Sequence, residues 1–277
     1  MSAELLRCDG RKKHAKNICP TSCYENFDAF LKYARKYGYS LEIASFAYGD
    51  VLDGDWQKIL KHHQKKLQNF KETISLHGAF QDIIIHSSDK KIKKVATDRI
   101  IQNLEIAKAL DAKYVVFHAS FNPLIRHERY EKNWVERNAN FWSEVLDKYH
   151  PTILLENLWE QNPETFRKLL DTIKSPRFKI CFDTGHANIF SKVPFEEWIN
   201  VLGKDIPYMH INDNKGDFDN ELVPGDGTIN WQEFSDTIGK HGIHPDIALE
   251  VGTIEKTKRS IEYFRKGKIY PFSIFST

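Results

Sequence analysis

The sequence predicts a single (β/α)8 barrel, a TIM barrel of the α/β class. Eight short β-rich apolar runs alternate with longer segments whose apolar residues recur at helical spacing. The chain has 277 residues, 41% of them hydrophobic, which suits one large barrel with a sizeable core. No Gly/Pro/Ser-rich linker is long enough to divide it. We therefore expect one domain over residues 1–277, with an N-terminal arm at 1–15 and a C-terminal tail at 267–277.

The eight apolar runs are the predicted strands. They cover residues 16–20, 41–45, 73–77, 114–118, 152–156, 178–183, 208–211 and 247–251. Crossover connections between parallel strands bring all the carboxyl ends to one face of a barrel, where the active sites of this fold lie. The strand ends are therefore where functional residues are expected.

Helices are predicted between these runs. The clearest periodic segments are residues 24–38, 95–112, 162–173, 193–203 and 231–242. Gly38, Gly203 and Gly242 stand at helix ends, as is typical of C-caps, and Asn230 is expected to cap the helix that starts at Trp231. A long helical region at 128–149 and a long loop at 212–230 complete the pattern, and long loops after barrel strands usually serve the active site.

Composition narrows the class of protein. The formal net charge is +2 with 28% charged residues, so no strong field favours binding to nucleic acid or membrane. Cys8, Cys19, Cys23 and Cys181 form no CxxC pair and do not resemble a disulfide framework. The N-terminus has no apolar signal region, and no stretch approaches the roughly 20 apolar residues of a membrane span. We expect a soluble, cytoplasmic protein with no membrane partner.

Two basic segments are interpreted as solvated helix faces. They are KHHQKK at 61–66, which includes His62 and His63, and DKKIKK at 89–94. Lysine runs in helical segments usually face water. Neither segment is therefore a candidate site.

Chemistry-bearing residues stand at or near the ends of seven predicted strands. They are Glu42, His77, His118, Glu156, Asp183, His210 and Glu250. A single carboxylate there would more often be a helix cap. Several carboxylates on one rim repel one another and raise each other's pKa, which a divalent cation relieves. Imidazoles among carboxylates suit Zn, Mn, Co or Fe(II), so the ring of residues predicts a metal site.

Seven segments in chain order resemble one superfamily. They are SLHGAF, VVFHAS, ILLENLW, ICFDTGHA, YMHINDN, DNELVPGDGTINW and IALEVGT. They look like the xylose-isomerase-like TIM barrels, which include sugar isomerases and epimerases, hydroxypyruvate isomerase, inosose dehydratase and the endonuclease IV type (AP endonuclease family 2). The resemblance extends from about residue 16 to 266. It implies the fold and a metal site, but one scaffold serves several reactions there.

The first function that the resemblance implies is isomerisation or epimerisation of a sugar or small hydroxy-carbonyl compound. Glu156, Asp183, His210 and Glu250 match the metal quartet of the sugar enzymes, which suits Mn²⁺, Mg²⁺ or Co²⁺. The metal would polarise a carbonyl and stabilise an enediolate. Glu156 and Glu250 would be the acid/base pair, and His186 would bind a substrate hydroxyl. A lyase or dehydratase would use the same chemistry.

Other residues are expected to line the pocket by their place on the loops. Phe80, Asn122 and Trp159 follow strands three, four and five, and Lys215 is the nearest basic group. No Gly-rich phosphate cradle is present, so a phosphorylated sugar is not indicated.

The alternative is a zinc phosphodiesterase acting on abasic DNA. The resemblance implies up to three zinc ions, held by His77 and His118 with Glu156, by the quartet, and by His186 with Asp219 and Glu221. Here Glu221 replaces the expected histidine, which changes the charge and the softness of the third site. The near-neutral charge and the lack of interleaved aromatic and basic residues favour a small sugar-like substrate over nucleic acid. His77 and His118 either bind a second metal or orient other groups by hydrogen bonds. A barrel that only binds a ligand is the third class.

Overall fold

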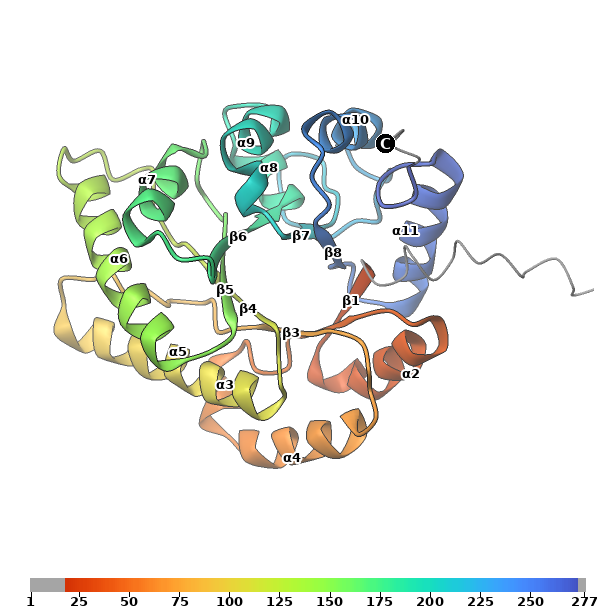
Figure 1. The fold of residues 1–277 in the computed structure, drawn as a ribbon, viewed down its shortest axis with the longest axis horizontal. Coiled ribbons are helices and arrows are strands. Elements are labelled where there is room, and N and C mark those ends of the chain that lie inside the picture. The colour runs from red at the N-terminus through yellow and green to blue at the C-terminus, as the bar shows by residue number, and fades with distance from the viewer. Residues whose placement is uncertain (1–17, 274–277) are drawn as a thin grey trace, which may run out of the picture.

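The computed structural model describes residues 18–273 and shows a closed barrel of eight parallel strands surrounded by helices (Figure 1). Neighbouring strands pair in chain order, and β1 closes the barrel against β8. The strands are β1 (Ile18–Ser22), β2 (Leu41–Ile43), β3 (Ile74–His77), β4 (Tyr114–His118), β5 (Thr152–Glu156), β6 (Phe178–Asp183), β7 (Tyr208–Ile211) and β8 (Asp246–Leu249). The predicted (β/α)8 barrel is confirmed. The predicted arm at 1–15 lies outside the described residues.

Helices cover the outside of the barrel (Figure 1). The α-helices are α2 (Phe27–Tyr37), α3 (Gly49–Asp53), α4 (Trp56–Leu67), α5 (Lys90–Ala109), α6 (Tyr130–Lys148), α7 (Glu164–Ile173), α8 (Thr184–Phe190), α9 (Phe195–Leu202), α10 (Trp231–His241) and α11 (Ile254–Gly267), with short 3₁₀ turns η1 (Tyr24–Asn26) and η2 (Gly203–Asp205). No helix among the described residues combines the length and the apolar character that crossing a membrane requires.

Helix ends follow the predicted signals in most places. Gly38 and Gly242 adopt the left-handed conformation of a C-cap, with φ of 71° and 60°. The side chain of Asn230 caps α10 by accepting a hydrogen bond from the N–H of Glu233. Gly203 differs from the prediction because its φ is −48° and the chain continues into η2.

One predicted helix start and the expectation that His63 faces solvent need correction. Helix α5 begins five residues before the predicted start, because Asp89 accepts hydrogen bonds from the backbone N–H groups of Lys91 and Ile92 and so begins the helix at Lys90. His63 does not face solvent. It is fully buried, stacks on Phe27 at 3.6 Å between ring centroids, and lies 2.9 Å from the hydroxyl of Ser45.

Alternation along the strands separates an outer core from an inner one. Strand side chains that point outward, such as those of Leu41, Ile153 and Met209, pack with the surrounding helices in the large core. Strand side chains that point inward fill the barrel interior. These inner residues are Cys19, Tyr114, Val116, Leu154, Cys181, Tyr208 and Ala248. The interior core leaves room for a site only beyond it, at the carboxyl ends of the strands.

The C-terminal tail packs on the outside of the barrel. Ile269 and Tyr270 are buried in the large core, and the N–H of Tyr270 donates to the hydroxyl of Ser235 on α10. The last four residues, 274–277, lie outside the described part of the chain.

Candidate metal centre

Each candidate ligand is the next inward-facing residue after an inner-core residue of the same strand. On strand after strand, an inner-core residue is followed two residues later by a histidine or a carboxylate. The pairs are Val116 and His118, Leu154 and Glu156, Cys181 and Asp183, Tyr208 and His210, and Ala248 and Glu250. Because side chains of a strand repeat direction every second residue, each ligand points into the barrel just above the inner-core layer. The period-two pattern therefore builds the ring that the sequence predicted.

Four of these residues form one ligand set. The donor atoms of Glu156, Asp183, His210 and Glu250 all lie within 4.8 Å of one another. Nδ1 of His210 is 3.2 Å from Oε1 of Glu156 and 3.2 Å from Oε2 of Glu250. The quartet that the resemblance implied is thus brought together in one place.

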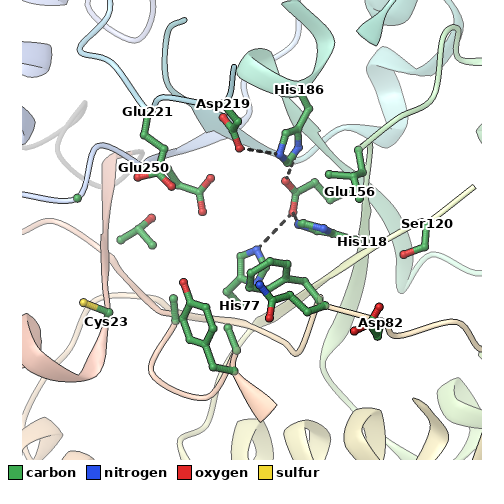
Figure 2. Close-up of a pocket in the computed structure, with 18 of the residues that line it drawn as sticks. Cys23, His77, Asp82, His118, Ser120, Glu156, His186, Asp219, Glu221 and Glu250 are labelled. Carbon is green, nitrogen blue, oxygen red and sulfur yellow. Dashed lines mark ion pairs between the residues drawn. The ribbon is translucent and has the colours of Figure 1, made fainter. Parts of the chain in front are cut away.

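A second ligand set shares Glu156. Nε2 of His118 lies 3.2 Å and Nε2 of His77 lies 3.5 Å from Oε2 of Glu156 (Figure 2). Nδ1 of His77 is 2.9 Å from the carbonyl oxygen of Gly78, so Nδ1 carries the proton and Nε2 is free to bind. The two oxygens of Glu156 therefore face two different groups of nitrogen donors.

His186 joins the cluster from helix α8. Its Nδ1 lies 2.9 Å from the carbonyl oxygen of Asn157 and 3.2 Å from Oε1 of Glu156. Its Nε2 lies 3.3 Å from Oδ2 of Asp219 on the loop after β7 (Figure 2). The side chain of Asn157 also makes two hydrogen bonds to the backbone of Asp183, at 2.8 and 3.0 Å. Asn157 thus holds the end of β6 and the His186 ring in place.

Opposite charges hold the cluster together. Burial raises the pKa of Glu156, but the imidazoles of His118 and His210 outweigh it and bring the pKa well below its usual range. Burial lowers the pKa of His186, but Asp183, Asp219 and Glu156 outweigh it and raise the pKa well above the usual value. So many buried carboxylates require positive charge beside them, either as protons on imidazoles or as a cation.

Several buried polar atoms fit a divalent cation. Both carboxylate oxygens of Glu156 and Nδ1 of His210 are buried without a hydrogen-bond partner. Unpaired buried groups of this kind are rare because they cost free energy. A mixed set of carboxylate oxygens and imidazole nitrogens is the chemistry that Zn, Mn or Co binds. Cys181 also lies within 4.8 Å of donors of Glu156 and His210, but burial raises its pKa and keeps it a thiol.

A cavity of about 680 Å³ opens over the cluster. The histidines and glutamates form one side of it, and Tyr48, Phe80 and Trp159 form an aromatic part of the remaining wall. The Phe80 ring lies 5.1 Å from the His118 ring between centroids. Among the described residues that line the cavity there is no lysine and no arginine. The cavity therefore combines carboxylates and imidazoles with apolar rings, and offers no cationic side chain besides histidine.

Of three other predicted site residues, one lines the cavity and two do not. Glu221 lines the cavity next to Glu250 (Figure 2). Burial and the charges of Glu250 and Asp219 raise its pKa to about 7. Asn122 and Lys215 do not line this cavity. The side chain of Asn122 accepts a hydrogen bond from the N–H of Leu124 and shapes the loop instead, and Lys215 is exposed to solvent.

Two residues near the site, Glu160 and Tyr48, had no predicted role, and Glu42, which was expected in the ring at the strand ends, belongs to no ligand set and does not line the cavity. Glu42 is fully buried and contacts Nε2 of His210 at 3.2 Å. Glu160 is buried and accepts hydrogen bonds from the N–H groups of Phe121 and Leu158, and burial raises its pKa to about 7. Tyr48 lines the cavity. The position of Glu42 between apolar neighbours in a short strand is a signal for a buried carboxylate, whereas Glu160 and Tyr48 stand in loops without such a pattern.

Comparison with known sequences identifies relatives of two kinds. The model of a family described as xylose isomerase-like TIM barrel matches residues 31–267. The uncharacterised protein MJ1311 of Methanocaldococcus jannaschii is 26% identical over 219 residues, which are 76% of this chain and 74% of that protein. A probable endonuclease 4 of Persephonella marina is 25% identical over 191 residues, 62% of this chain and 66% of that protein.

Solved structures share the fold. The TTHB071 protein of Thermus thermophilus, soaked with ZnCl₂, superposes with a TM-score of 0.73 at 21% identity and covers 90% of this chain and 97% of that one. A D-tagatose 3-epimerase-like protein superposes with a TM-score of 0.74 at 23% identity and covers 90% of this chain and 96% of that one. At these identities the likeness establishes the barrel alone.

Proposed function

Since the chain belongs to the xylose isomerase-like TIM-barrel family, we propose that it is a divalent-metal-dependent isomerase or epimerase of a sugar or a small hydroxy-carbonyl compound. One observation carries the proposal. Unpaired ligand atoms of Glu156 and His210 lie beneath a cavity whose described lining has carboxylates, imidazoles and aromatic rings but no lysine or arginine. Such a lining suits an uncharged polyhydroxylated substrate and has no cationic partner for a phosphate group.

Glu156, Asp183, His210 and Glu250 would hold the metal. When bound, a divalent cation polarises a carbonyl group and makes the neighbouring C–H more acidic. In this chain, the carboxylates of Glu250, which directly follows β8, and Glu156, at the end of β5, point toward one another (Figure 2). Their donor atoms lie within 4.8 Å. We assign them to removing and returning the substrate proton, because both line the cavity in which a substrate would bind.

Glu250 is the more accessible of the two carboxylates. Its side chain is 17% exposed, whereas that of Glu156 is 1% exposed and enclosed by imidazoles. His186 would bind a substrate hydroxyl through Nε2, which it would share with the exposed Asp219 carboxylate 3.3 Å away, since its Nδ1 is engaged with the buried backbone of Asn157. Tyr48, Phe80 and Trp159 would pack against the C–H face of the substrate and exclude water.

The test is exchange of a substrate C–H with solvent deuterium, followed by NMR on a panel of ketoses and hydroxy-ketones with metal-loaded protein. We expect metal-dependent exchange that Glu250→Gln abolishes. Asp82→Asn is the matched control, because Asp82 lines the cavity but belongs to no ligand set. Absence of exchange by the wild-type protein across the panel would contradict the proposal.

The second candidate is a zinc phosphodiesterase acting on abasic DNA. It is favoured by the second ligand set, in which His77 and His118 face the oxygen of Glu156 that the first set leaves free. Two metal ions that share a carboxylate are typical of phosphoester hydrolysis. Incision of a duplex with one abasic site by the zinc-loaded protein, absent with an undamaged duplex, would establish this activity and displace the isomerase proposal.

A further inference from the structure

A buried polar network lies inside the barrel beneath the metal centre. Its central group is the carboxylate of Glu42 on β2, whose side chain points inward while its neighbours Leu41 and Ile43 pack in the outer core. Glu42 is fully buried and does not line the cavity. It has no access to a substrate, so its role must pass through the side chains that it contacts.

Three donors surround this carboxylate. Thr21 donates to Oε1 at 3.1 Å, and Tyr208 donates its hydroxyl hydrogen to Oε2 at 2.9 Å. Nε2 of His210 lies 3.2 Å from the same Oε2. These contacts come from β1 and β7, so the carboxylate joins parts of the chain that are up to 168 residues apart. The Glu42 side chain is thereby held in one orientation.

The contact with His210 determines which ring nitrogen carries the proton. An ionised carboxylate only accepts hydrogen bonds, so Nε2 of His210 must be the donor. In the neutral ring Nδ1 is then unprotonated, and its lone pair is available to bind a metal ion. That atom is buried, has no hydrogen-bond partner and faces Oε1 of Glu156 and Oε2 of Glu250 at 3.2 Å each. The ring is thus presented to the ligand set with its basic nitrogen foremost.

We propose that Glu42, oriented by Tyr208, is a positioning residue that fixes the tautomer and the ring orientation of His210 and strengthens it as a metal ligand. A negative charge on the far side of an imidazole increases electron density at the nitrogen that binds the metal. The proposal rests on the metal site of the proposed function, but it does not depend on which substrate the site takes.

Ser75 and Cys19 complete the network without reaching the histidine. The hydroxyl of Ser75 lies 2.7 Å from the hydroxyl of Tyr208, and Sγ of Cys19 lies 3.2 Å from the same oxygen. The Tyr208 hydroxyl has one hydrogen, and the carboxylate of Glu42 is a stronger acceptor for it than the sulfur of Cys19. The hydroxyl of Ser75 can then donate to the Tyr208 oxygen. Tyr114 offers a contrast, because it belongs to the same inner core but makes no hydrogen bond to this network.

The test measures zinc affinity by competition with a chromophoric chelator, without substrate. In Glu42→Gln the charge is lost, and we expect zinc binding about tenfold weaker or more, the usual effect of removing a group that orients a ligand. In Tyr208→Phe we expect a several-fold loss in the same direction. Tyr114→Phe makes the same chemical change in the same core and is expected to bind zinc as tightly as wild type.

A second measurement separates positioning from general damage to the fold. Thermal unfolding of the metal-free variants reports stability, and the absorption spectrum of bound Co²⁺ reports the ligand geometry, which a purely structural role of Glu42 would leave unchanged. Wild-type affinity in both Glu42→Gln and Tyr208→Phe would overturn the proposal. If Glu42→Gln does not fold, the comparison of Tyr208→Phe with Tyr114→Phe decides. Failure of the wild-type protein itself to bind zinc, manganese or cobalt would instead refute the metal site.

Discussion

Asp183 accepts a hydrogen bond of 2.6 Å through Oδ1 from the backbone N–H of His186, and so begins the helix that carries this histidine. Its other oxygen, Oδ2, accepts from the side chain of Asn212 and faces Nδ1 of His210 at 3.9 Å. One carboxylate therefore acts as a helix cap and as a member of the ligand set. The two roles, which are usually alternatives for a strand-end carboxylate, combine because α8 starts directly at the end of β6.

The two roles of Asp183 are separable by substitution. Asp183→Asn keeps an oxygen that caps α8 but removes the charge, so we expect bound metal to fall about tenfold or more with a small loss of stability. Asp183→Ala also removes the cap, which costs about 1 kcal/mol more. Elemental analysis measures the metal, and urea unfolding measures the free energy. Equal stability of the two variants would contradict the capping role, and undiminished metal in both would contradict the ligand role.

Removing one imidazole of the second ligand set is expected to affect one metal and not the other. His118→Gln takes away a nitrogen near Oε2 of Glu156 and leaves the quartet intact. We expect two metal ions per wild-type chain and one per variant, measured by elemental analysis after dialysis. His127→Gln, on the exposed loop after β4, is the control and should retain both. A single metal ion in the wild-type chain would show that His77 and His118 only orient other groups.

Gly185 is needed because the Asn212 side chain fills the space beside it. A Cβ at this position would lie 1.9 Å from Oδ1 of Asn212. We expect Gly185→Ala to destabilise the fold by about 1–3 kcal/mol, as overpacking does in a close-packed interior. Urea unfolding of Gly185→Ala, Asn212→Ala and the double variant forms the test. If the clash with Asn212 is the cause, the double variant loses less stability than the sum of the two single losses. Losses that simply add would exclude the clash as the cause.

The buried His63 makes stability depend on pH. Burial lowers its pKa from 6.5 to about 4, because the charged ring would lose its hydration. Because the pKa of His63 is lower in the folded chain, the unfolded chain binds a proton on this ring at a higher pH than the folded chain does. The stability of the fold is therefore unaffected by this group above pH 6.5 and decreases as the pH falls toward 4. Between pH 6.5 and about 5, the loss amounts to about 2 kcal/mol.

Replacing this ring by one that cannot titrate tests the prediction. His63→Phe keeps an aromatic ring against Phe27 and should lose less stability than wild type between about pH 7 and pH 5, as measured by urea unfolding at both values. Other titrating groups cancel in the comparison. Parallel pH profiles of wild type and His63→Phe would mean that His63 does not become charged in this range on unfolding.

The pattern of the sequence alone determined the barrel and most of the ligand ring. Apolar runs of strand length alternating with helical periodicity specify parallel strands, and period two along each strand puts Glu156, Asp183 and His210 on the inward side. These are local properties, because the spacing of residues a few positions apart in the sequence is enough to determine them. The predicted ends of strands three to seven are confirmed for this reason. The first strand ends two residues later than predicted, at Ser22, and the second two residues earlier, at Ile43. β8 ends at Leu249, and Glu250 follows it.

Tertiary structure decided everything that depends on closure of the barrel. Glu42 is separated from His210 by 168 residues, and their contact exists only because eight strands close into a cylinder with one shared interior. The burial of His63 against Phe27 likewise depends on the packing of α4 on α2, although its local surroundings are charged. The loop after β7 places Asp219 against His186 but leaves Lys215 exposed. Side-chain partners of this kind are set by chain closure and packing, which no short stretch of sequence contains.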